Sequence, residues 1–357
     1  MKDIFKQSVL SLEGYISPPQ KDFRVKLNQN ESPFDVPADL KEELTDAAKS
    51  IPWNRYPINE SPLLTGKLAQ RHGVTPNQIL LGNGSNQLFQ TLLTAIIEPG
   101  DAVLYTPPTF SLFELFVQLY EGRLLNAIQL PGMGYPLDNV MDFIYSQQPK
   151  LILMCSPNNP TGGNIDLEYV ETMCEASSGL IFFDEAYAEF AGYSAIDLLN
   201  SHNNVLVSRT FSKAFSMAGL RFGYFVGHES LIQQLRKVNI PYTVNVFTEL
   251  VATRLLDHRD RMQEQVDWII SERDRMSAEM RDLPNLVVYP SSANFILMGA
   301  ERLNLFQRLK ERGVLVRDVG EYPFLQDHQR VTVGFREEND IFLRELRDIL
   351  TSEDKKS

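Results

Sequence analysis

Three short runs of the chain are continuously apolar: Leu151–Cys155, Leu180–Phe183 and Val205–Ser208. An amphipathic helix or a half-exposed strand would interrupt such a run with polar positions, whereas a strand covered on both faces does not. The three runs therefore predict neighbouring strands inside a parallel sheet. Helical segments between them complete an α/β layout, in which helices cover the faces of the sheet.

A strand–helix alternation also precedes these runs. It begins near residue 75 with a strand over Gln78–Leu81, a turn at Gly82–Gly84 and a helix over Asn86–Ile97. The Pro and Gly of residues 98–100 end this helix. The alternation continues with a strand at Ala102–Tyr105, a helix at Phe110–Tyr120 and an extended segment at Arg123–Gln129.

The pattern changes after about residue 245. A long amphipathic helix over Glu249–Leu283 is followed by an α+β unit with a small core of its own. Its expected strands are Val287–Tyr289, Asn294–Met298, Val314–Arg317 and Arg330–Phe335, and its helices are Leu303–Arg312 and Asn339–Thr351.

These changes along the chain predict its division into domains. Residues 1–45 are rich in Pro, Asn and Gln and show little periodicity, so we expect an extended N-terminal arm that also contributes to the small domain. A large domain over 46–248 and a small C-terminal domain over 249–357 follow. A chain of 357 residues is long enough for two cores.

Composition and charge exclude several classes of protein. The formal net charge is −12, which argues against nucleic-acid and anionic-membrane partners. No apolar run reaches the roughly 18 residues of a membrane span, and the N-terminus lacks a secretory signal. Cys155 and Cys174 form no CxxC pair, and the five histidines are scattered, so we expect no disulfide and no metal. These features predict a cytoplasmic, metal-free protein.

Polar residues follow each of the three apolar runs. They are Ser156–Gly163 after the first, Asp184–Tyr187 after the second and Ser208–Lys213 after the third. Ligands of doubly wound sheets bind outside the carboxyl ends of the strands. The three segments are therefore expected to meet in one crevice.

The Gly-rich turn Gly82–Asn86 lies between a strand and a helix, where backbone N–H groups bind anions. It is not a dinucleotide-binding fingerprint, because Gln87 occupies a position that needs a small residue. Gly66-Lys67 is not a nucleotide-binding P-loop, because the upstream glycine is missing. Taken alone, the turn is more often an ordinary βα turn with a Ser or Asn cap.

Lys213 follows the third apolar run by five residues and is flanked by residues with small hydroxyl side chains. A lysine amine in such a place loses its proton easily and attacks carbonyl groups. Arg221 can bind a phosphate through its planar guanidinium fork, and Thr210 and Ser212 can donate hydroxyl hydrogen bonds. A lysine and an arginine flanking a solvated helix remain the alternative from these residues alone.

With these residues in view, the chain resembles the fold-type I enzymes that depend on pyridoxal 5′-phosphate (PLP). It is most similar to the class I/II aminotransferases, in the histidinol-phosphate aminotransferase branch. The matching segments run in order along nearly the whole chain: Lys26–Pro33 (KLNQNESP), Arg55–Pro57, Gly82–Asn86, Tyr105–Phe110, Ser156–Gly162 (SPNNPTG), Phe183–Tyr187 (FDEAY), Ser212–Phe215, Gly219–Gly223, Ser292–Phe295 and Arg330–Gly334. The resemblance implies the PLP-dependent transferase fold: a large domain with a mostly parallel seven-stranded sheet, and a small α+β C-terminal domain.

The resemblance also implies roles for the cofactor residues. Lys213 would bind the cofactor covalently and then move the proton at the substrate Cα, and Asp184 would pair with the pyridine nitrogen. Asn159 and Tyr187 would hydrogen-bond the phenolic oxygen. Phe110 would stack on the ring, where the family commonly has Tyr. The phosphate would be bound by Gly84, Ser85, Asn86, Thr210, Ser212 and Arg221.

For the substrates, a small-molecule amino donor and a 2-oxo acid, the resemblance implies five residues. Arg330 and Arg317 match the arginines that bind the substrate carboxylate or phosphate. Tyr56 matches a tyrosine that reaches the active site of the neighbouring subunit, which implies a homodimer. Asn30 and Tyr15 lie in the arm that folds over the site. Arg336 is a further basic candidate, although Arg-Glu-Glu after a strand is more often the solvated start of a helix.

The leading hypothesis is amino transfer between L-histidinol phosphate and 2-oxoglutarate. An aromatic or other amino-acid aminotransferase is the runner-up. A PLP-dependent threonine-phosphate decarboxylase is a third possibility, although its Gly-rich, His-containing arm is replaced here by Asn28–Pro33. A PLP-binding regulatory module is disfavoured, because this acidic chain has no spare segment for a DNA-binding domain.

Overall fold

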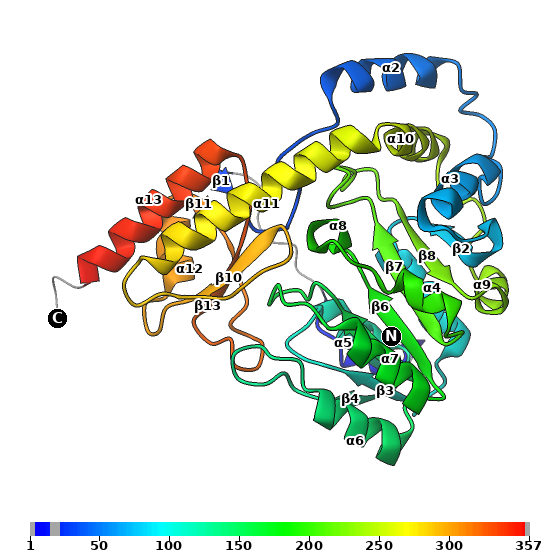
Figure 1. Cartoon of the computed structure of the whole chain (residues 1–357), viewed down its shortest axis with the longest axis horizontal. Helices are drawn as coiled ribbons and strands as arrows, with labels where there is room; N and C mark the ends of the chain where they lie inside the picture. Colours follow the sequence, from blue (N-terminus) through cyan, green and yellow to red (C-terminus); the bar gives the residue numbers. More distant parts are fainter. Residues whose placement is uncertain (1–3, 15–21, 354–357) are drawn as a thin grey trace.

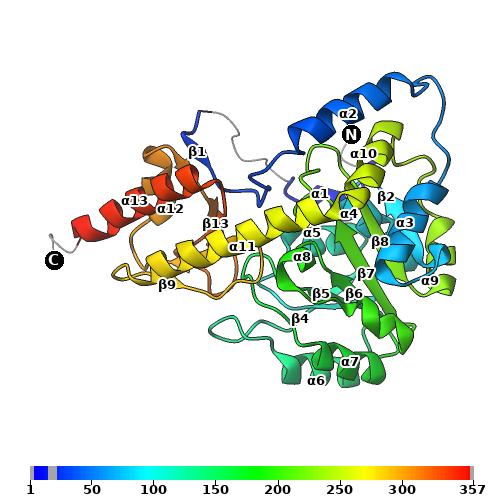
Figure 2. The ribbon, with the colours of Figure 1, turned by 45° about the horizontal axis from the view of Figure 1, so that its top comes forward.

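The computed structural model describes residues 4–14 and 22–353. A central sheet with helices on both of its faces lies beside a smaller group of strands and helices, coloured orange to red in Figure 1. The long helix α11 (Arg259–Arg281) runs from one group to the other (Figure 2). None of the helices in these ranges has both the length and the apolar character needed to cross a membrane.

The central sheet has seven strands in the order β2-β8-β7-β6-β5-β3-β4. β8 is antiparallel to both of its neighbours, and the other pairs are parallel. The three apolar runs form the central strands, so the expected α/β fold with a mostly parallel sheet is confirmed. The strands are β2 Ile79–Gly82, β3 Ala102–Tyr105, β4 Arg123–Asn126, β5 Leu151–Cys155, β6 Leu180–Asp184, β7 Val205–Thr210 and β8 Gly223–Gly227.

Helices cover both faces of this sheet. In β6, Phe182 packs on one face against Leu88 and Phe113, while Phe183 belongs to the core on the other face with Val140 and Val170. This alternation follows from the two-residue period of a strand. The first face is covered by α4 (Ser85–Ile96), α5 (Ser111–Leu119) and α9 (Glu229–Arg236), and the second by α3 (Pro62–His72), α6 (Leu137–Gln147) and α7 (Leu167–Ala176).

The smaller group is an α+β unit, as expected. Its four-stranded antiparallel sheet has the order β12-β13-β10-β9. The elements are β9 Val287–Val288, β10 Phe295–Gly299, α12 Leu305–Glu311, β11 Val314–Leu315, β12 Arg317–Asp318, β13 His328–Thr332 and α13 Arg336–Glu353. The strand expected over Val314–Arg317 is thus divided between two sheets, because β11 pairs with the N-terminal arm instead.

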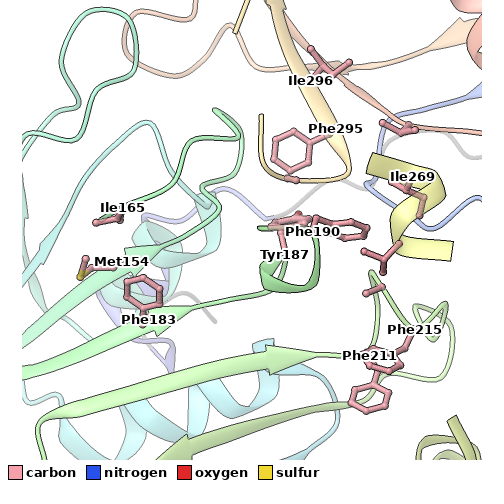
Figure 3. Close-up of a cluster of buried hydrophobic side chains, with 14 of the residues drawn as sticks. Met154, Ile165, Phe183, Tyr187, Phe190, Phe211, Phe215, Ile269, Phe295 and Ile296 are labelled. Carbon is pink, nitrogen blue, oxygen red and sulfur yellow. The ribbon is translucent and has the colours of Figure 1, made fainter. Parts of the chain in front are cut away.

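The hydrophobic core continues from the large sheet into the smaller unit. Figure 3 shows Phe295 of β10 above Tyr187, with Ile269 of α11 beside them. The rings of Tyr187 and Phe295 pack edge to face with centroids 5.1 Å apart, a geometry that aromatic pairs prefer. The two units therefore share one packed interface directly beside Tyr187.

Two predictions of secondary structure were wrong. The single helix expected over Glu249–Leu283 is two helices, α10 (Val246–Asp257) and α11. The chain leaves the helical conformation at His258, with φ −108° and ψ 30°. An amphipathic pattern gives no sign of such a break, because each half keeps its own buried stripe.

The N-terminal arm is also not fully extended. Residues Ala38–Lys49 form α2, which buries Leu40, Leu44 and Ala48 four residues apart on one face. Upstream, the two-residue strand β1 (Val25–Lys26) pairs in parallel with β11. This pairing brings Asn28–Asn30 to the central cavity. The predicted domain bounds at residues 45 and 248 stay a prediction.

The remaining short elements fill the connections. They are α1 Gln7–Leu10, η2 Pro76–Gln78, α8 Ala188–Ala191 and η3 Ala195–Asn200. β8 was not predicted, because its five residues begin and end with Gly, a residue that weakens the signal of a strand.

Candidate active site

A cavity of about 620 Å³ lies at the carboxyl ends of β5, β6 and β7, between the large sheet and the smaller unit. It collects the polar segments that follow the three central strands, as the sequence predicted. The predicted residues that line it are Asn30, Ser85, Asn86, Phe110, Asn159, Asp184, Tyr187, Thr210, Ser212, Lys213, Arg221, Arg317 and Arg330.

Lys213 follows β7 and is partly buried. Its Nζ donates a hydrogen bond to the carbonyl oxygen of Gln29 at 3.0 Å. Desolvation, with a further contribution from the nearby Arg330 guanidinium, lowers the pKa of Lys213 to about 8. At neutral pH about one amine in ten is then unprotonated, far more than for an ordinary lysine. The amine is therefore suited to act as a nucleophile and as a base.

Asp184 ends β6 and is buried. Burial raises the pKa of its carboxyl group to about 7, although the backbone N–H of Ala186 donates to Oδ1 at 3.1 Å and acts in the opposite direction. A carboxylate held in such a place is stabilised by a cation that binds beside it. The site can thus hold a proton between Asp184 and a basic ligand atom.

Tyr187, Asn30 and Thr332 form a buried chain of hydrogen bonds. The Nδ2 of Asn30 donates to the hydroxyl of Tyr187 at 2.9 Å, and the hydroxyl of Thr332 donates to the Oδ1 of Asn30 at 3.2 Å. Burial raises the pKa of Tyr187 to about 12, so the phenol keeps its proton. The side chain of Asn30 thus positions Tyr187. The predicted contact of Asn30 with the substrate stays a prediction.

Arg330 and Arg317 enter the cavity from adjacent strands. They are directly opposite each other in the register of β12 and β13. The guanidinium of Arg330 donates to the Oδ1 of Asn159 and to the carbonyl oxygen of Asn28, the latter at 2.8 Å. Its Cζ lies 5.3 Å from the centre of the Phe295 ring. These contacts fix the fork of Arg330 in one orientation, beside a second arginine.

An anion site lies at the N-terminal end of α4. Ser212 Oγ accepts hydrogen bonds from Arg221 Nη1 at 3.3 Å and from Thr210 Oγ1 at 3.0 Å. Ser85 and Asn86 begin the helix and line the same part of the cavity. Gly84 has a φ of +79°, and a Cβ there would lie 2.8 Å from Arg221 Nη2. The N-terminus of α4, the two hydroxyl groups and the guanidinium of Arg221 can all donate hydrogen bonds to an anion. Together they are suited to bind a phosphate.

Among the described residues, the predicted site residues Gly84, Tyr56 and Arg336 are not among those that line the central cavity. Tyr56 is 83% exposed and stacks on Tyr242, with ring centroids 4.9 Å apart. It lines a separate groove of about 660 Å³ with Ile58 and Leu63. Arg336 begins α13 and is not among the residues that line the central cavity. Tyr15 lies outside the described residues. Phe110, by contrast, precedes α5 at the cavity, with its ring edge-on to Phe113.

Sequence analysis missed two features of the site. Asn28 lines the cavity, although only Asn30 of the motif Lys26–Pro33 was selected. Behind the sheet, Glu185 forms a buried ion pair with Arg209, whose Nε lies 2.7 Å from Glu185 Oε2. Burial raises the pKa of Glu185, and Arg209 supplies the opposing charge. A charged residue inside the otherwise uncharged, fully buried β7 was the signal for this pair.

The chain is similar to known proteins over nearly all of its length. The family model "Aminotransferase class I and II" matches residues 24–346. A histidinol-phosphate aminotransferase of Thermoanaerobacter sp. (strain X514) is 35% identical over 334 residues, which is 92% of this chain and 93% of the relative.

Solved structures show the same fold at lower identity. The histidinol-phosphate aminotransferase of Sinorhizobium meliloti, solved with PLP, is 23% identical, covers 98% of each chain and gives a TM-score of 0.88. L-threonine-O-3-phosphate decarboxylase of Porphyromonas gingivalis is 21% identical, covers 92% of this chain and 99% of its own, and gives a TM-score of 0.78. The fold is therefore shared by enzymes with different reactions.

The residues of the cavity fit PLP. Its phosphate matches the anion site at α4, where Gly84 has a positive φ of +79° beside the Arg221 guanidinium. Its pyridine nitrogen is basic, as the ligand atom beside Asp184 needs to be. Its aldehyde needs an unprotonated amine, which the lowered pKa of Lys213 provides. No cluster of three or more His, Cys, Asp or Glu that could bind a metal occurs in residues 4–14 and 22–353.

Proposed function

The chain belongs to the class I and II aminotransferases, and from this premise we propose that it transfers the amino group of L-histidinol phosphate to 2-oxoglutarate. The products are imidazole acetol phosphate and L-glutamate, in a step of histidine biosynthesis. PLP is the cofactor of this enzyme, in keeping with its family and with the fit of the cavity.

The pair Arg330 and Arg317 carries the proposal for the substrate. An aminotransferase takes two substrates in turn at one site, here a phosphate monoester and a dicarboxylic 2-oxo acid. Guanidinium forks bind both kinds of anion with paired, charge-assisted hydrogen bonds. Two arginines opposite each other on β12 and β13 therefore provide one anion site for both half-reactions. The 35% identical relative, named for histidinol phosphate, supports the same donor.

The residues around the cofactor have separate roles in the proposed mechanism. When bound, PLP delocalises the negative charge that develops at the substrate Cα. Asp184 would hold the cofactor by keeping its pyridine nitrogen protonated, and Tyr187 would donate a hydrogen bond to the cofactor. The Lys213 amine would remove the proton at the substrate Cα. Its pKa of about 8 is close to neutral pH, which is the range in which a general base is effective.

We further propose that the enzyme is a homodimer. A group of large apolar side chains is exposed around the groove that contains Tyr56: Trp53, Tyr56, Ile58, Leu63, Ile240, Tyr242 and Phe247, of which Trp53, Tyr56 and Ile58 are more than 70% exposed. Exposed apolar patches of this kind mark protein interfaces. A two-fold interface there would carry Tyr56 to the partner's active site. A location in the cytoplasm also stays a prediction.

Replacing Asp184 by Asn tests the electrostatic role of its carboxylate. The substitution keeps the shape of the side chain and removes the charge that holds the ring nitrogen protonated. We expect turnover to fall about 100- to 1000-fold while the cofactor stays bound. Steady-state rates, together with the visible absorbance of bound cofactor as the control, measure both effects. Near-normal turnover with full cofactor occupancy would show that Asp184 has no such role.

Arg330→Ala tests the shared anion site. Each charge-assisted contact to an anion contributes about 1.5–3 kcal/mol, so kcat/KM should fall about 10- to 100-fold for both L-histidinol phosphate and 2-oxoglutarate. Unphosphorylated histidinol is the matched control and should be affected far less. Arg330→Lys should restore only part of the loss, because a point charge cannot replace the planar fork.

The same assay compares donors in the wild-type enzyme and decides between the candidate functions. L-histidinol phosphate should be preferred to phenylalanine and tyrosine by kcat/KM. A preference for the aromatic amino acids would identify the runner-up, an aromatic aminotransferase. Release of carbon dioxide from threonine phosphate would identify the decarboxylase, whose fold is also similar.

Mixed dimers test the role of Tyr56. A Tyr56→Ala homodimer should lose about tenfold or more in kcat/KM if each site takes a hydrogen bond from its partner. A dimer of one Tyr56→Ala subunit and one Lys213→Ala subunit should regain about half of the wild-type activity, since one of its two sites is then complete. A mixed dimer that is no more active than Tyr56→Ala alone, or a monomer in sedimentation, contradicts the proposal.

A further inference from the structure

Asn28 is buried in the wall of the active-site cavity without a hydrogen-bond partner for its side chain. It is 2% exposed. Among the described residues, neither its Nδ2 nor its Oδ1 has a partner. A buried polar group left in this state costs about 1–3 kcal/mol, and native structures contain few of them. A role for this amide in binding a ligand would account for the cost.

Two other asparagines that are buried or half-buried, Asn339 and Asn204, have structural partners. Asn339 donates to the carbonyl oxygen of Gly334 at 2.7 Å and accepts from the backbone N–H of the same residue at 2.9 Å. Asn204 donates to the carbonyl oxygens of Cys174 and Ser177, each at 3.1 Å. These side chains stabilise loops and turns. The amide of Asn28 makes no comparable contact.

The position of Asn28 ties it to the anion site. Its carbonyl oxygen accepts the hydrogen bond from Arg330 Nη2 at 2.8 Å. Asn28 and Arg317 line the active-site cavity together, and both also line an adjoining cavity of about 190 Å³. The pairing of β1 with β11 and the buried Leu27 hold Asn28 in place. The backbone of Asn28 is therefore held against Arg330, and Asn28 shares both cavities with Arg317.

The two anions that this site must accept differ in their number of oxygens. A carboxylate has two, which match the two N–H groups of one guanidinium fork. A phosphate monoester has three terminal oxygens and, when singly protonated, also an O–H group. To hydrogen-bond every phosphate oxygen, the site needs a donor besides the guanidinium fork. When the phosphate carries a proton, the site also needs an acceptor for the O–H group. An asparagine amide has both.

We propose that Asn28 is a specificity-determining residue that binds the phosphate of the amino donor. Its Nδ2 donates to a phosphate oxygen that the arginines leave without a partner, and its Oδ1 accepts from the phosphate O–H when that group is protonated. The carboxylate of 2-oxoglutarate or glutamate depends on Arg330 and not on this amide. The inference rests on the proposed function and deepens it, because it gives the site a way to favour phosphate over carboxylate.

The experiment measures the two half-reactions separately in Asn28→Ala. We expect kcat/KM for L-histidinol phosphate to fall about tenfold or more, mostly through KM, and kcat/KM for glutamate to fall less than about threefold. The inhibition constant of inorganic phosphate against the glutamate half-reaction should rise about tenfold. Asn204→Ala is the matched control: it should lower the unfolding temperature and leave the ratio of the two substrates unchanged.

The possible outcomes separate the inference from the proposed function. Equal losses for both substrates, or an unchanged inhibition constant for phosphate, would show that Asn28 has only a structural role. A wild-type enzyme that does not use L-histidinol phosphate would contradict the proposed function. Inorganic phosphate would then still decide the inference: weaker inhibition in Asn28→Ala supports it, and no inhibition of the wild-type enzyme overturns it.

Discussion

Asn30, Tyr187 and Thr332 come from three distant parts of the chain and meet in one buried chain of hydrogen bonds. The rest of the active site depends on this junction, because the arm, the large sheet and the smaller unit each supply part of the cavity. The pairing of β1 with β11 and the edge-to-face contact of Tyr187 with Phe295 hold the same three parts together. The core is continuous across this interface, and such packing holds Arg330 and Lys213 in position relative to Asp184.

Burial determines the chemistry of the groups gathered there. Desolvation lowers the pKa of Lys213 and raises that of Asp184, so the two values lie much closer together than those of an ordinary lysine and aspartic acid. A site with an available amine and a carboxyl group that needs a cationic partner is suited to a cofactor with an aldehyde and a basic ring nitrogen. Burial also raises the pKa of the neighbouring Glu185, and the charge of Arg209, which lies against it, acts in the opposite direction. Removing one member of such a buried pair costs about 3–5 kcal/mol, which indicates how firmly the turn after Asp184 is held.

Much of this site could be predicted from the sequence, since strand ends in a parallel sheet converge wherever the sheet forms. Lys213, Asp184 and Arg221 lie next to strands whose apolar pattern is plain, and the cavity contains them all. The break at His258 and the helix α2 were not predicted, because tertiary packing and not local pattern decides them. Asn28 and Asn30 lie two residues apart in one motif. Only the structure shows that the side chain of Asn30 has hydrogen-bond partners and that of Asn28 has none within the described residues. The proposed role of Tyr56 requires a second subunit, so the structure of a single chain does not show it.

We propose that the Lys213 amine, made reactive by burial, holds the cofactor. The most direct measurement loads the enzyme with PLP, fixes the covalent adduct with borohydride and maps it by mass spectrometry over a range of pH. The label should lie on the peptide of Lys213 and be absent in Lys213→Ala. Labelling of the apoenzyme should be half-maximal in rate near pH 8 and fall about tenfold for each pH unit below, because only the unprotonated amine reacts. A label on another lysine such as Lys26, or a half-maximal pH typical of an exposed lysine, would contradict this account.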